Sequence, residues 1–390
     1  MQGLFDRALW GALVLAGACG SGNTDTPPPA AGSGGAGGTG GSGSYSGGSG
    51  GNAAKGGVGG QGGQMGAGAR SGSNAAGSGG GSASAGRCFA KPLFSSQMAW
   101  NQRVDTKPKD AQSDTIIAAL QGRGWGNGGI MQIDFSIDVL CADATTPRRE
   151  FEPNGDFYEG ECDQEAVPVP SGGHLEGESG YQCTGDGDCH LIVIAEDTNK
   201  LYEQWRVNID GADYQGGCLA VWQLDRNYDA ALRGEQCTSA DAAGLPITPL
   251  LFDADEVAGG AIEHAVRFAL PNMHIRKNTY VRPATHATGA ASAGADGVPY
   301  GARLRLRADY PLDSLPNEAA RVLARALQRY GMILADGGNI ALMGQDDRST
   351  TAKWDDLLAP RDLDDLKPRD FELVEAGERF TWTGDCVLED

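Results

Sequence analysis

Short runs of alternating or continuous apolar residues recur between positions 130 and 375, and they predict a chain built mainly of β-strands. The clearest alternation is IMQIDFSIDVL at residues 130–140, which predicts a single strand. Residues 190–195 and 200–209 flank the turn sequence EDTN, and this spacing predicts a β-hairpin. Further strands are expected at residues 218–224, 262–270, 278–282, 302–308, 332–335 and 371–375.

Two segments follow a helical period instead. Residues 113–121 predict a short helix with Ser113 as its N-cap and Gly122 as its end. Residues 317–330 predict a longer helix that ends at Gly331. Its expected buried stripe is Val322, Leu323, Ala326, Leu327 and Tyr330. Because the strands do not alternate with helices, the pattern favours a mainly β fold, namely an antiparallel sandwich or jelly roll with a few helices.

The N-terminus carries an export signal. Residues 8–18 form an apolar run that is too short to span a bilayer and is typical of a signal peptide. The run ends in LAGA directly before Cys19, which resembles a bacterial lipobox and implies cleavage before Cys19 and lipid on its sulfur. Gly20 in the next position implies a lipid anchor in the outer membrane or at the cell surface. The alternative is an ordinary secretory signal cut near Ala18, which would release a secreted protein.

A low-complexity segment follows the signal. Residues 20–86 contain 28 of the 61 glycines of the chain, with much Ser and Ala and a single aromatic residue, Tyr45. Such a segment cannot bury enough apolar surface to offset its ordering entropy. We therefore expect a disordered tether with an end-to-end distance of about 45 Å, and an adhesive or wall-threading segment is the alternative. The expected organisation is signal peptide 1–18, lipidated Cys and linker 19–86, and globular domain 87–390.

Charge limits the partners of the chain. The formal net charge is −20, and residues 88–390 hold 27 Lys and Arg against 49 Asp and Glu. Nucleic acids and anionic membrane surfaces both need a basic surface, so neither is expected as a main partner. No later run reaches 18 apolar residues, and membrane contact is expected only through the N-terminal lipid.

Eight further cysteines predict up to four disulfides in an exported protein. Pairing by proximity along the chain gives Cys141–Cys162, Cys183–Cys189, Cys218–Cys237 and a clasp between Cys88 and Cys386. No Cys-x-x-Cys pair is present, so a zinc site is not favoured and no metal ligands are expected. Residues 186–188, Asp-Gly-Asp, offer oxygen ligands for Ca²⁺, but a disulfide-closed turn is the favoured interpretation.

Seven motifs resemble, in the same order, those of an uncharacterised family of secreted bacterial proteins. They are Trp100-Asn101, VPVPSGGHLEG (167–177), HLIVIAEDTNKLYE (190–203), CTSADAAGLPI (237–247), AIEHAVRF (261–268), YGARLRL (300–306) and ALQRYGMILADGGN (326–339). The similarity covers most of residues 98–375 and implies an extracellular location, with no established activity or catalytic residues to carry over. Asn199 stands where the family pattern has a Cys, and Cys183 and Cys189 lie in an inserted loop, which implies rewired disulfides.

Two histidines are candidates for proton transfer. His264 shares a strand face with Ile262 and Val266, so a core or cleft histidine is favoured over an acid or base. His286 follows Tyr280 and Arg282 at the end of a predicted strand. A polysaccharide lyase needs these residue types, because Arg neutralises a uronate carboxylate while His or Tyr moves protons. Structural hydrogen bonds are the alternative role for all three.

Asp336 is the leading candidate carboxylate. It follows the predicted strand 332–335 and precedes Gly337, an arrangement that is common at active sites and equally common as a turn cap. Together with Glu256 or Asp253 it would form the carboxylate pair of a glycosidase. Aromatic side chains that stack on sugars would come from five tryptophans, most of which we expect in the core: Trp100, Trp205, Trp222, Trp354 and Trp382.

These features predict an extracytoplasmic, lipid-anchored, disulfide-stabilised β-rich domain that binds or cleaves a carbohydrate, with no cofactor. If it is an enzyme, it is a polysaccharide hydrolase or lyase. The alternative is a surface lipoprotein that binds a ligand or has a structural role without catalysis. The candidate catalytic residues are Asp336, His286, Arg282, Glu256 and His264.

Overall fold

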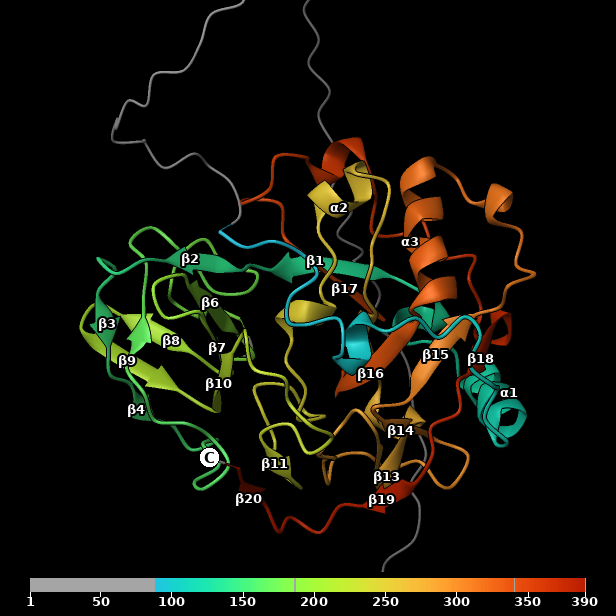
Figure 1. Ribbon diagram of the computed structural model, residues 1–390, viewed down its shortest axis with the longest axis horizontal. Coiled ribbons are helices and arrows are strands. Elements are labelled where there is room, and N and C mark those ends of the chain that lie inside the picture. The colour runs from blue at the N-terminus through green and yellow to red at the C-terminus, as the bar shows by residue number, and fades with distance from the viewer. Residues whose placement is uncertain (1–87, 186, 340, 390) are drawn as a thin grey trace, which may run out of the picture. The chain divides into compact units, whose positions relative to one another are not determined.

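The computed structural model describes residues 88–185, 187–339 and 341–389 (Figure 1). The predicted signal peptide, Cys19 and the Gly-rich linker lie outside the described residues. Within the described part, short strands greatly outnumber the α-helices, which are α1 (Ser113–Arg123), α2 (Ala254–Ala258) and α3 (Glu318–Arg329). The prediction of a mainly β domain with a few helices is therefore confirmed. In this part of the chain, no helix has the length and apolar character needed to cross a membrane.

A six-stranded mixed sheet forms the centre of the domain. Its strands, in spatial order, are β1 (Ile133–Ile137), β17 (Leu342–Gln345), β12 (Val266–Leu270), β16 (Met332–Gly337), β15 (Arg303–Leu306) and β18 (Phe371–Leu373). β1 pairs with β17 and β12 pairs with β16 in parallel, while the other neighbours are antiparallel. A wholly antiparallel fold was therefore a wrong prediction. All five residues of β12 are buried, as in parallel strands that are covered on both faces.

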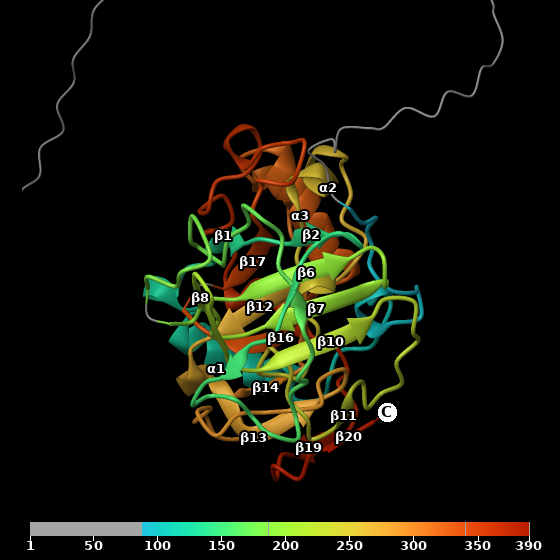
Figure 2. The same cartoon turned by 90° about the vertical axis from the view of Figure 1, so that its left-hand side faces the viewer.

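The predicted hairpin is confirmed in a second sheet. This sheet has the order β10 (Leu219–Gln223), β7 (Lys200–Gln204), β6 (Leu191–Ala195) and β2 (Leu140–Ala142). β6 and β7 pair antiparallel around the predicted turn, and β10 extends them, so the three strands run side by side (Figure 2). β2 adds to β6 in parallel.

The single strand expected at residues 130–140 is divided between the two sheets. β1 pairs with β17 in the six-stranded sheet, and β2 pairs with β6 in the four-stranded sheet. Asp138 and Val139 lie at the break, and both side chains are buried. The alternation of apolar residues continues across the break, which is why the sequence predicts one strand.

Four small sheets complete the domain. Two of them have three strands: one has the order β14 (Val298–Tyr300), β13 (Ile275–Val281) and β19 (Arg379–Thr381), and the other has the order β4 (Glu152–Pro153), β9 (Asp213–Gly216) and β8 (Asn208–Asp210). The other two have two strands each: β3 (Arg148–Arg149) pairs with β5 (Val167–Pro168), and β11 (Gly234–Glu235) pairs with β20 (Val387–Leu388). The pairing of β11 with β20 ties the C-terminal strand to the middle of the chain.

The two predicted helices are present with small changes at their ends. α3 begins after Asn317, whose side chain accepts a hydrogen bond from the Ala320 amide, and its predicted apolar stripe is buried except for the half-buried Tyr330. Ser113 is the first residue of α1 and Gln112 is its N-cap, and the Ser113 hydroxyl accepts a hydrogen bond from the Leu373 amide of β18. α1 ends at Arg123, and Gly124 with a positive φ of 81° follows it.

Most tryptophans belong to the core, as expected. Trp100 and Trp222 are fully buried and Trp354 is nearly so, whereas Trp205 and Trp382 are only partly buried. The main core packs α1 and α3 against the six-stranded sheet, with α3 on β15 and α1 on β18. A smaller core lies around β6, β7 and β9.

Four disulfides join the eight described cysteines: Cys88–Cys141, Cys162–Cys218, Cys183–Cys189 and Cys237–Cys386. Only Cys183–Cys189 was predicted correctly, and the other three predicted pairs were wrong. Pairing by proximity along the chain failed because strand pairing brings distant cysteines together. For example, β11 pairs with β20, Cys237 closely follows β11 and Cys386 directly precedes β20. Four disulfides indicate that the domain matures in an oxidising, extracytoplasmic environment.

Candidate active site

A buried arginine organises the candidate site. Arg267 is the second residue of β12, and its Nε and Nη2 donate to the two carboxylate oxygens of Asp241 at 3.0 and 2.9 Å. Nη2 also donates to Oδ2 of Asp336 at 2.9 Å. Arg267 and Asp241 are almost completely buried, so each compensates a charge that would be very costly alone.

Asp336 is the member of this group that reaches solvent. Its side chain is 26% exposed, whereas that of Asp241 is fully buried. Asp336 is brought to this position by an irregularity between β12 and β16, where Ala269 pairs with Asp336 although Phe268 pairs with Leu334. The extra residue in β16, Ala335, uses its carbonyl to accept a hydrogen bond from Ala243 of the Asp241 loop. The bulge therefore shifts the alternation of side chains and aims Asp336 at that loop.

The environment of Asp336 favours its protonated form. Burial, and then the negative charge of Asp241, raise the pKa of Asp336 to about 7, although Arg267 and His190 act in the opposite direction. The attraction of Arg267 does not cancel the effect of burial, because its guanidinium is shared with Asp241. A carboxylic acid with a pKa near neutrality is suited to donate a proton.

A second ion pair extends the network behind Arg267. Nδ1 of His190 contacts the Glu176 carboxylate at 2.6 Å, and Nε2 lies 3.2 Å from the Ala240 carbonyl oxygen. Burial disfavours the imidazolium ion, but the neighbouring Glu176 carboxylate outweighs this effect and raises the pKa of His190 to about 9. With both ring nitrogens beside acceptors, His190 is a fixed cation that holds the Asp241 loop.

His286 lines the same pocket as Asp336. The Nδ1–H group of His286 donates to the Ala242 carbonyl at 2.7 Å, and its backbone amide donates to Ala243. Burial lowers the pKa of His286 to about 4, so the ring is neutral near pH 7. The Trp382 ring meets its edge at a centroid distance of 5.0 Å and fixes its orientation.

The pocket itself has a volume of about 290 Å³. Asp336, Asp241, His286 and Tyr300 line it together with Asp188, Trp205 and Tyr158. Trp205 donates its indole N–H to Asp188, so the aromatic ring and the carboxylate are held as one unit. Tyr158 is largely exposed, which places an additional aromatic ring where a ligand can reach it. The lining therefore combines carboxylates, a neutral histidine and aromatic surface.

Arg282 and Tyr280 do not join His286, which corrects the lyase arrangement expected from the sequence. Both side chains bind the Glu235 carboxylate, and the Arg282 guanidinium lies 4.6 Å from the centroid of the Phe380 ring. Arg282 lines a different hollow, beside Trp100. Tyr280 and Arg282 are two residues apart and share one side at the end of β13, whereas His286 lies in the loop beyond the strand.

Glu256, Asp253 and His264 also lie outside the pocket, so the predicted carboxylate pairs with Asp336 are wrong. Nε2 of His264 lies 3.2 Å from Glu256 Oε1, and Lys91 Nζ lies 3.7 Å from Glu256 Oε2. Despite burial, the neighbouring His264 and Lys91 side chains lower the pKa of Glu256 to about 2. Asp253 and Glu256 cap α2 reciprocally. His264 is fully buried, which agrees with its interpretation as a core histidine.

The sequence failed to identify three residues of the site. Arg267 carries the clearest signal, because a charged side chain in the middle of a continuous apolar strand must find buried partners. Asp241 is hidden in the small-residue motif CTSADAAGLPI, and Tyr300 in a short strand. Of the suggested calcium ligands, Asp186 lies outside the described residues, and Asp188 belongs to the pocket instead.

Comparison with known proteins adds no relative: no protein-family model, no curated protein and no solved structure matches this chain.

Proposed function

We propose that the domain hydrolyses a glycosidic bond in the Asp336 pocket. The observation that carries this proposal is a carboxyl group, Asp336, that reaches solvent beside the buried Arg267–Asp241 pair, in a pocket that also presents aromatic surface. Burial and the neighbouring Asp241 carboxylate raise the pKa of Asp336. Such an acid is protonated in part near neutral pH and can transfer its proton to the oxygen of a leaving sugar.

Each pocket carboxylate has a distinct part in the proposed reaction. Asp336 donates its proton to the glycosidic oxygen as the bond from that oxygen to the anomeric carbon breaks. Asp188 takes a proton from the attacking water, whose oxygen forms the new bond at that carbon. Asp241 holds Arg267 and positions Asp336, because both of its oxygens are bonded to the guanidinium. The products together contain one added water.

Aromatic rings support a sugar as the ligand. Trp205 and Tyr158 offer ring faces on which the C–H groups of a sugar can stack. The volume of about 290 Å³ is at the lower end of the range for small-molecule sites, about 300–1,000 Å³. A pocket of this size fits a short stretch of a polysaccharide.

The location of the enzyme is proposed from the N-terminus. Lipid on Cys19 would anchor it to the cell envelope, and the four disulfides agree with export. Replacing Cys19 by Ser should move the protein from the membrane to the soluble fraction. An unchanged membrane fraction would show that the anchor is not this lipid.

A product screen tests the reaction. The full chain, matured under oxidising conditions, is incubated with a panel of polysaccharides, and the products are weighed by mass spectrometry. We expect fragments that carry one added water, and at least a 100-fold loss of their release in Asp336→Asn. Arg282→Gln, which alters a different hollow, is the matched control and should keep full activity. Unsaturated fragments, lighter by one water, would instead indicate a lyase.

The second candidate is a carbohydrate-binding lipoprotein without catalysis. It is favoured by the direct bond from Arg267 to Asp336, because an ion triad of this kind also serves as a purely structural element. Retention of the chain on a polysaccharide with no fragments released would select this candidate. Weakened retention in Trp205→Ala would then locate the binding surface in the same pocket.

A further inference from the structure

Three side chains of metal-ligand type converge where two parallel strands end. Asp138 directly follows β1, and Asp346 directly follows β17, its parallel partner in the six-stranded sheet. Because Ile137 pairs with Gln345, the next residue of each strand is carried to the same edge. His174 reaches this edge from the loop after β5, and each of the three residues places a ligand atom within 4.8 Å of the others.

The cluster is nearly removed from solvent. Asp138, His174 and Asp346 are 6%, 9% and 8% exposed. Two carboxylates held together in such a place repel one another unless a cation or a proton lies beside them. Arg348 supplies one positive charge, since its Nε lies 3.4 Å from Asp346 Oδ2, but half of its side chain is exposed and it also bonds the Glu178 carbonyl.

One buried oxygen of the cluster has no hydrogen-bond partner in the part of the chain that the structure describes. Oδ1 of Asp138 is buried and has no hydrogen-bond partner among the described residues. Nδ1 of His174 lies 3.3 Å from the Leu175 carbonyl oxygen, and with its proton on Nδ1 the ring presents Nε2 as a metal ligand. That nitrogen lies 2.9 Å from Oδ2 of Asp138. An imidazole oriented by a carbonyl through its other nitrogen is the usual arrangement of a metal ligand.

We propose that Asp138, His174 and Asp346 bind a divalent transition-metal ion such as Zn²⁺. One imidazole nitrogen and two carboxylates suit such an ion better than Ca²⁺ or Mg²⁺, which prefer oxygen ligands alone. Ligand bonds of about 2.0–2.2 Å place tetrahedral ligand atoms about 3.3 Å apart. Nε2 and Oδ2 at 2.9 Å would therefore separate by only about 0.4 Å to admit the ion.

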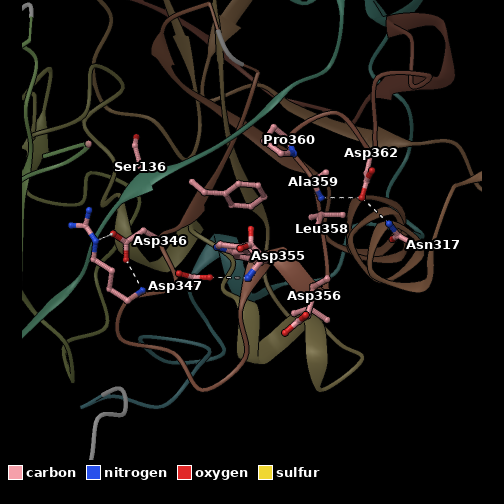
Figure 3. Close-up of a pocket in the computed structure, with 15 residues that line it drawn as sticks. Ser136, Asn317, Asp346, Asp347, Asp355, Asp356, Leu358, Ala359, Pro360 and Asp362 are labelled. Carbon is pink, nitrogen blue, oxygen red and sulfur yellow. Dashed lines mark hydrogen bonds and ion pairs between the residues drawn. The ribbon is translucent and has the colours of Figure 1, made fainter. Parts of the chain in front are cut away.

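The ion has a path of entry from an acidic pocket of about 750 Å³. Asp346 belongs both to the cluster and to the wall of this pocket (Figure 3). In that wall it contacts Arg348. Asp347, Asp355, Asp356 and Asp362 also line the pocket and attract cations. With three protein ligands, a tetrahedral ion keeps one position for water or a ligand.

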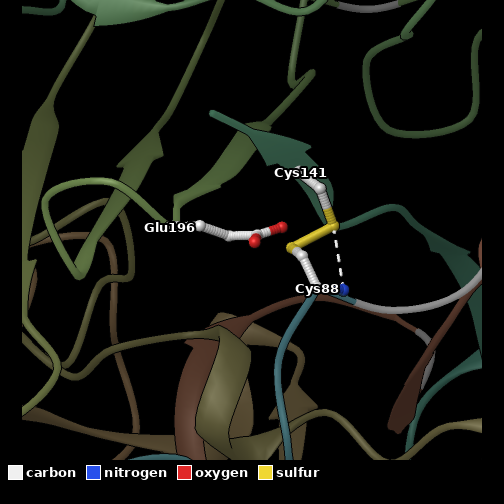
Figure 4. A group of neighbouring side chains, drawn as sticks. All are labelled: Cys88, Cys141 and Glu196. Atoms are coloured by element: carbon white, nitrogen blue, oxygen red, sulfur yellow. Dashed lines mark hydrogen bonds between the residues drawn. A yellow bond between two sulfur atoms is a disulfide. The ribbon is translucent and has the colours of Figure 1, made fainter. Parts of the chain in front are cut away.

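Other groups of possible ligands in the described residues do not compete for the ion. Cys88 and Cys141 lie beside Glu196, but their sulfurs are joined in a disulfide, so only the carboxylate remains (Figure 4). Cys183 and Cys189, near Glu178, are joined in the same way. Thiolates bind metals, whereas disulfide sulfurs do not serve as such ligands.

Metal binding by the chain tests the proposal without any knowledge of its activity. The full chain, with disulfides intact and no polyhistidine tag, is stripped with EDTA and dialysed against ZnSO₄, and bound zinc is measured by elemental analysis. We expect one Zn²⁺ per chain and at least a tenfold weaker affinity in Asp138→Asn and in His174→Gln. Asp356→Asn removes a charge from the same acidic pocket but lies outside the cluster, so it should bind as the unaltered chain does.

Two results would overturn the proposal. One is no stoichiometric zinc in the unaltered chain, and the other is equal affinity in all three variants, which would assign binding to the general acidity of the pocket. Near-UV circular dichroism identifies a variant that fails to fold. If Asp138→Asn or His174→Gln fails in this way, the zinc affinity of the other variant tests the proposal. Co²⁺ in place of Zn²⁺ gives a second readout, because visible absorption bands of a tetrahedral site should appear in Asp356→Asn and be absent in His174→Gln. No step of the proposed hydrolysis uses this site. A failure to bind zinc would therefore not count against the hydrolysis, and a failure to hydrolyse polysaccharides would not count against the metal site.

Discussion

At the scale of single residues, Arg267 determines the state of both acids around it. Its guanidinium binds Asp241 through two nitrogens and Asp336 through one of these nitrogens. Asp241 is fully buried and therefore depends on this cation, whereas Asp336 can exchange its partner for water in the pocket. The unequal sharing leaves Asp336 as the acid that can be protonated near neutral pH.

Removing the guanidinium should be severely destabilising. In Arg267→Met the Asp241 carboxylate stays buried without its cation, so we expect a loss of about 3–5 kcal/mol in the free energy of unfolding. Urea denaturation followed by tryptophan fluorescence measures this loss. Arg282→Gln breaks a partly exposed ion pair with Glu235 and should cost about 0–1 kcal/mol. Similar small losses in both variants would be inconsistent with the role given to Arg267.

Asp336 should also make stability depend on pH. Its folded-state pKa of about 7 is above the value of about 3.9 for an unfolded Asp, so protonation favours the folded state. This contribution is complete below about pH 4 and is lost as the pH rises through 7. The free energy of unfolding of Asp336→Asn, relative to the unaltered chain, should therefore increase from pH 4 to pH 8. A difference that stays constant over this range would refute the raised pKa.

At the scale of elements, the parallel pairs of the six-stranded sheet create both candidate sites. The bulge between β12 and β16 aims Asp336 into its pocket. The ends of β1 and β17 bring Asp138 and Asp346 together. In each case a carboxylate stands at or directly after the carboxyl end of a strand, where ligand sites of sheets with parallel strands are usually found.

The N-terminus of α3 gives a prediction at this scale. Asn317 accepts a hydrogen bond from the Ala320 amide at 2.8 Å and donates to Asp362 at 2.7 Å. Asn317→Ala removes both bonds and should lower the free energy of unfolding by about 1–2 kcal/mol. Asn317→Ser keeps a capping oxygen and should recover most of this loss in the same thermal or urea titration. Equal losses in the two variants would show that the cap is unimportant.

Local patterns predicted the elements that depend on local interactions. The β6–β7 hairpin and α3 with its buried stripe follow from alternation, turn residues and helical spacing. The mixed order of the six-stranded sheet does not follow from local patterns, because β12 and β16 are separated along the chain by three strands and an α-helix. The division of residues 130–140 between two sheets was missed for the same reason: the alternation is unbroken, and only the partner strands differ.

The candidate site was predicted in part. Asp336 and His286 were both selected from the sequence, and they do meet in one pocket. Arg267 was missed because its strand was assigned from its apolar residues alone. His174 and Asp346 form no local motif with Asp138, since metal-ligand spacing is recognisable only when the ligands lie close in the chain.

At the scale of the whole domain, disulfides join distant segments to the site. Cys237–Cys386 ties the C-terminal strand β20 to the start of the loop that holds Asp241. Cys162–Cys218 fastens the loop after β4 to the start of β10. Cys183–Cys189 closes only a short turn. Long-range links of this kind limit the freedom of the unfolded chain most.

Removing the disulfide with the longest span and removing the one with the shortest span should destabilise the domain by different amounts. The pair Cys237–Cys386 spans 149 residues and Cys183–Cys189 spans six. The chain-entropy model gives about 5 kcal/mol for the first and about half of that for the second. Replacing each pair by Ala should therefore lower the melting temperature more for Cys237–Cys386, as measured by calorimetry. A larger effect of Cys183–Cys189 would contradict the importance of the link between β20 and the Asp241 loop.

The most direct measurement is the titration of Asp336 itself. In the full chain labelled with ¹³C at the Asp carboxyl groups, the Asp336 resonance is assigned by its absence in Asp336→Asn, and its chemical shift is followed from pH 3 to pH 9. A midpoint close to pH 7 is expected if buried Arg267, Asp241 and the pocket hold this group as a proton donor. A midpoint near pH 4 would mean that Asp336 is an ordinary ionised partner of Arg267, and the proposed role in acid catalysis would be wrong.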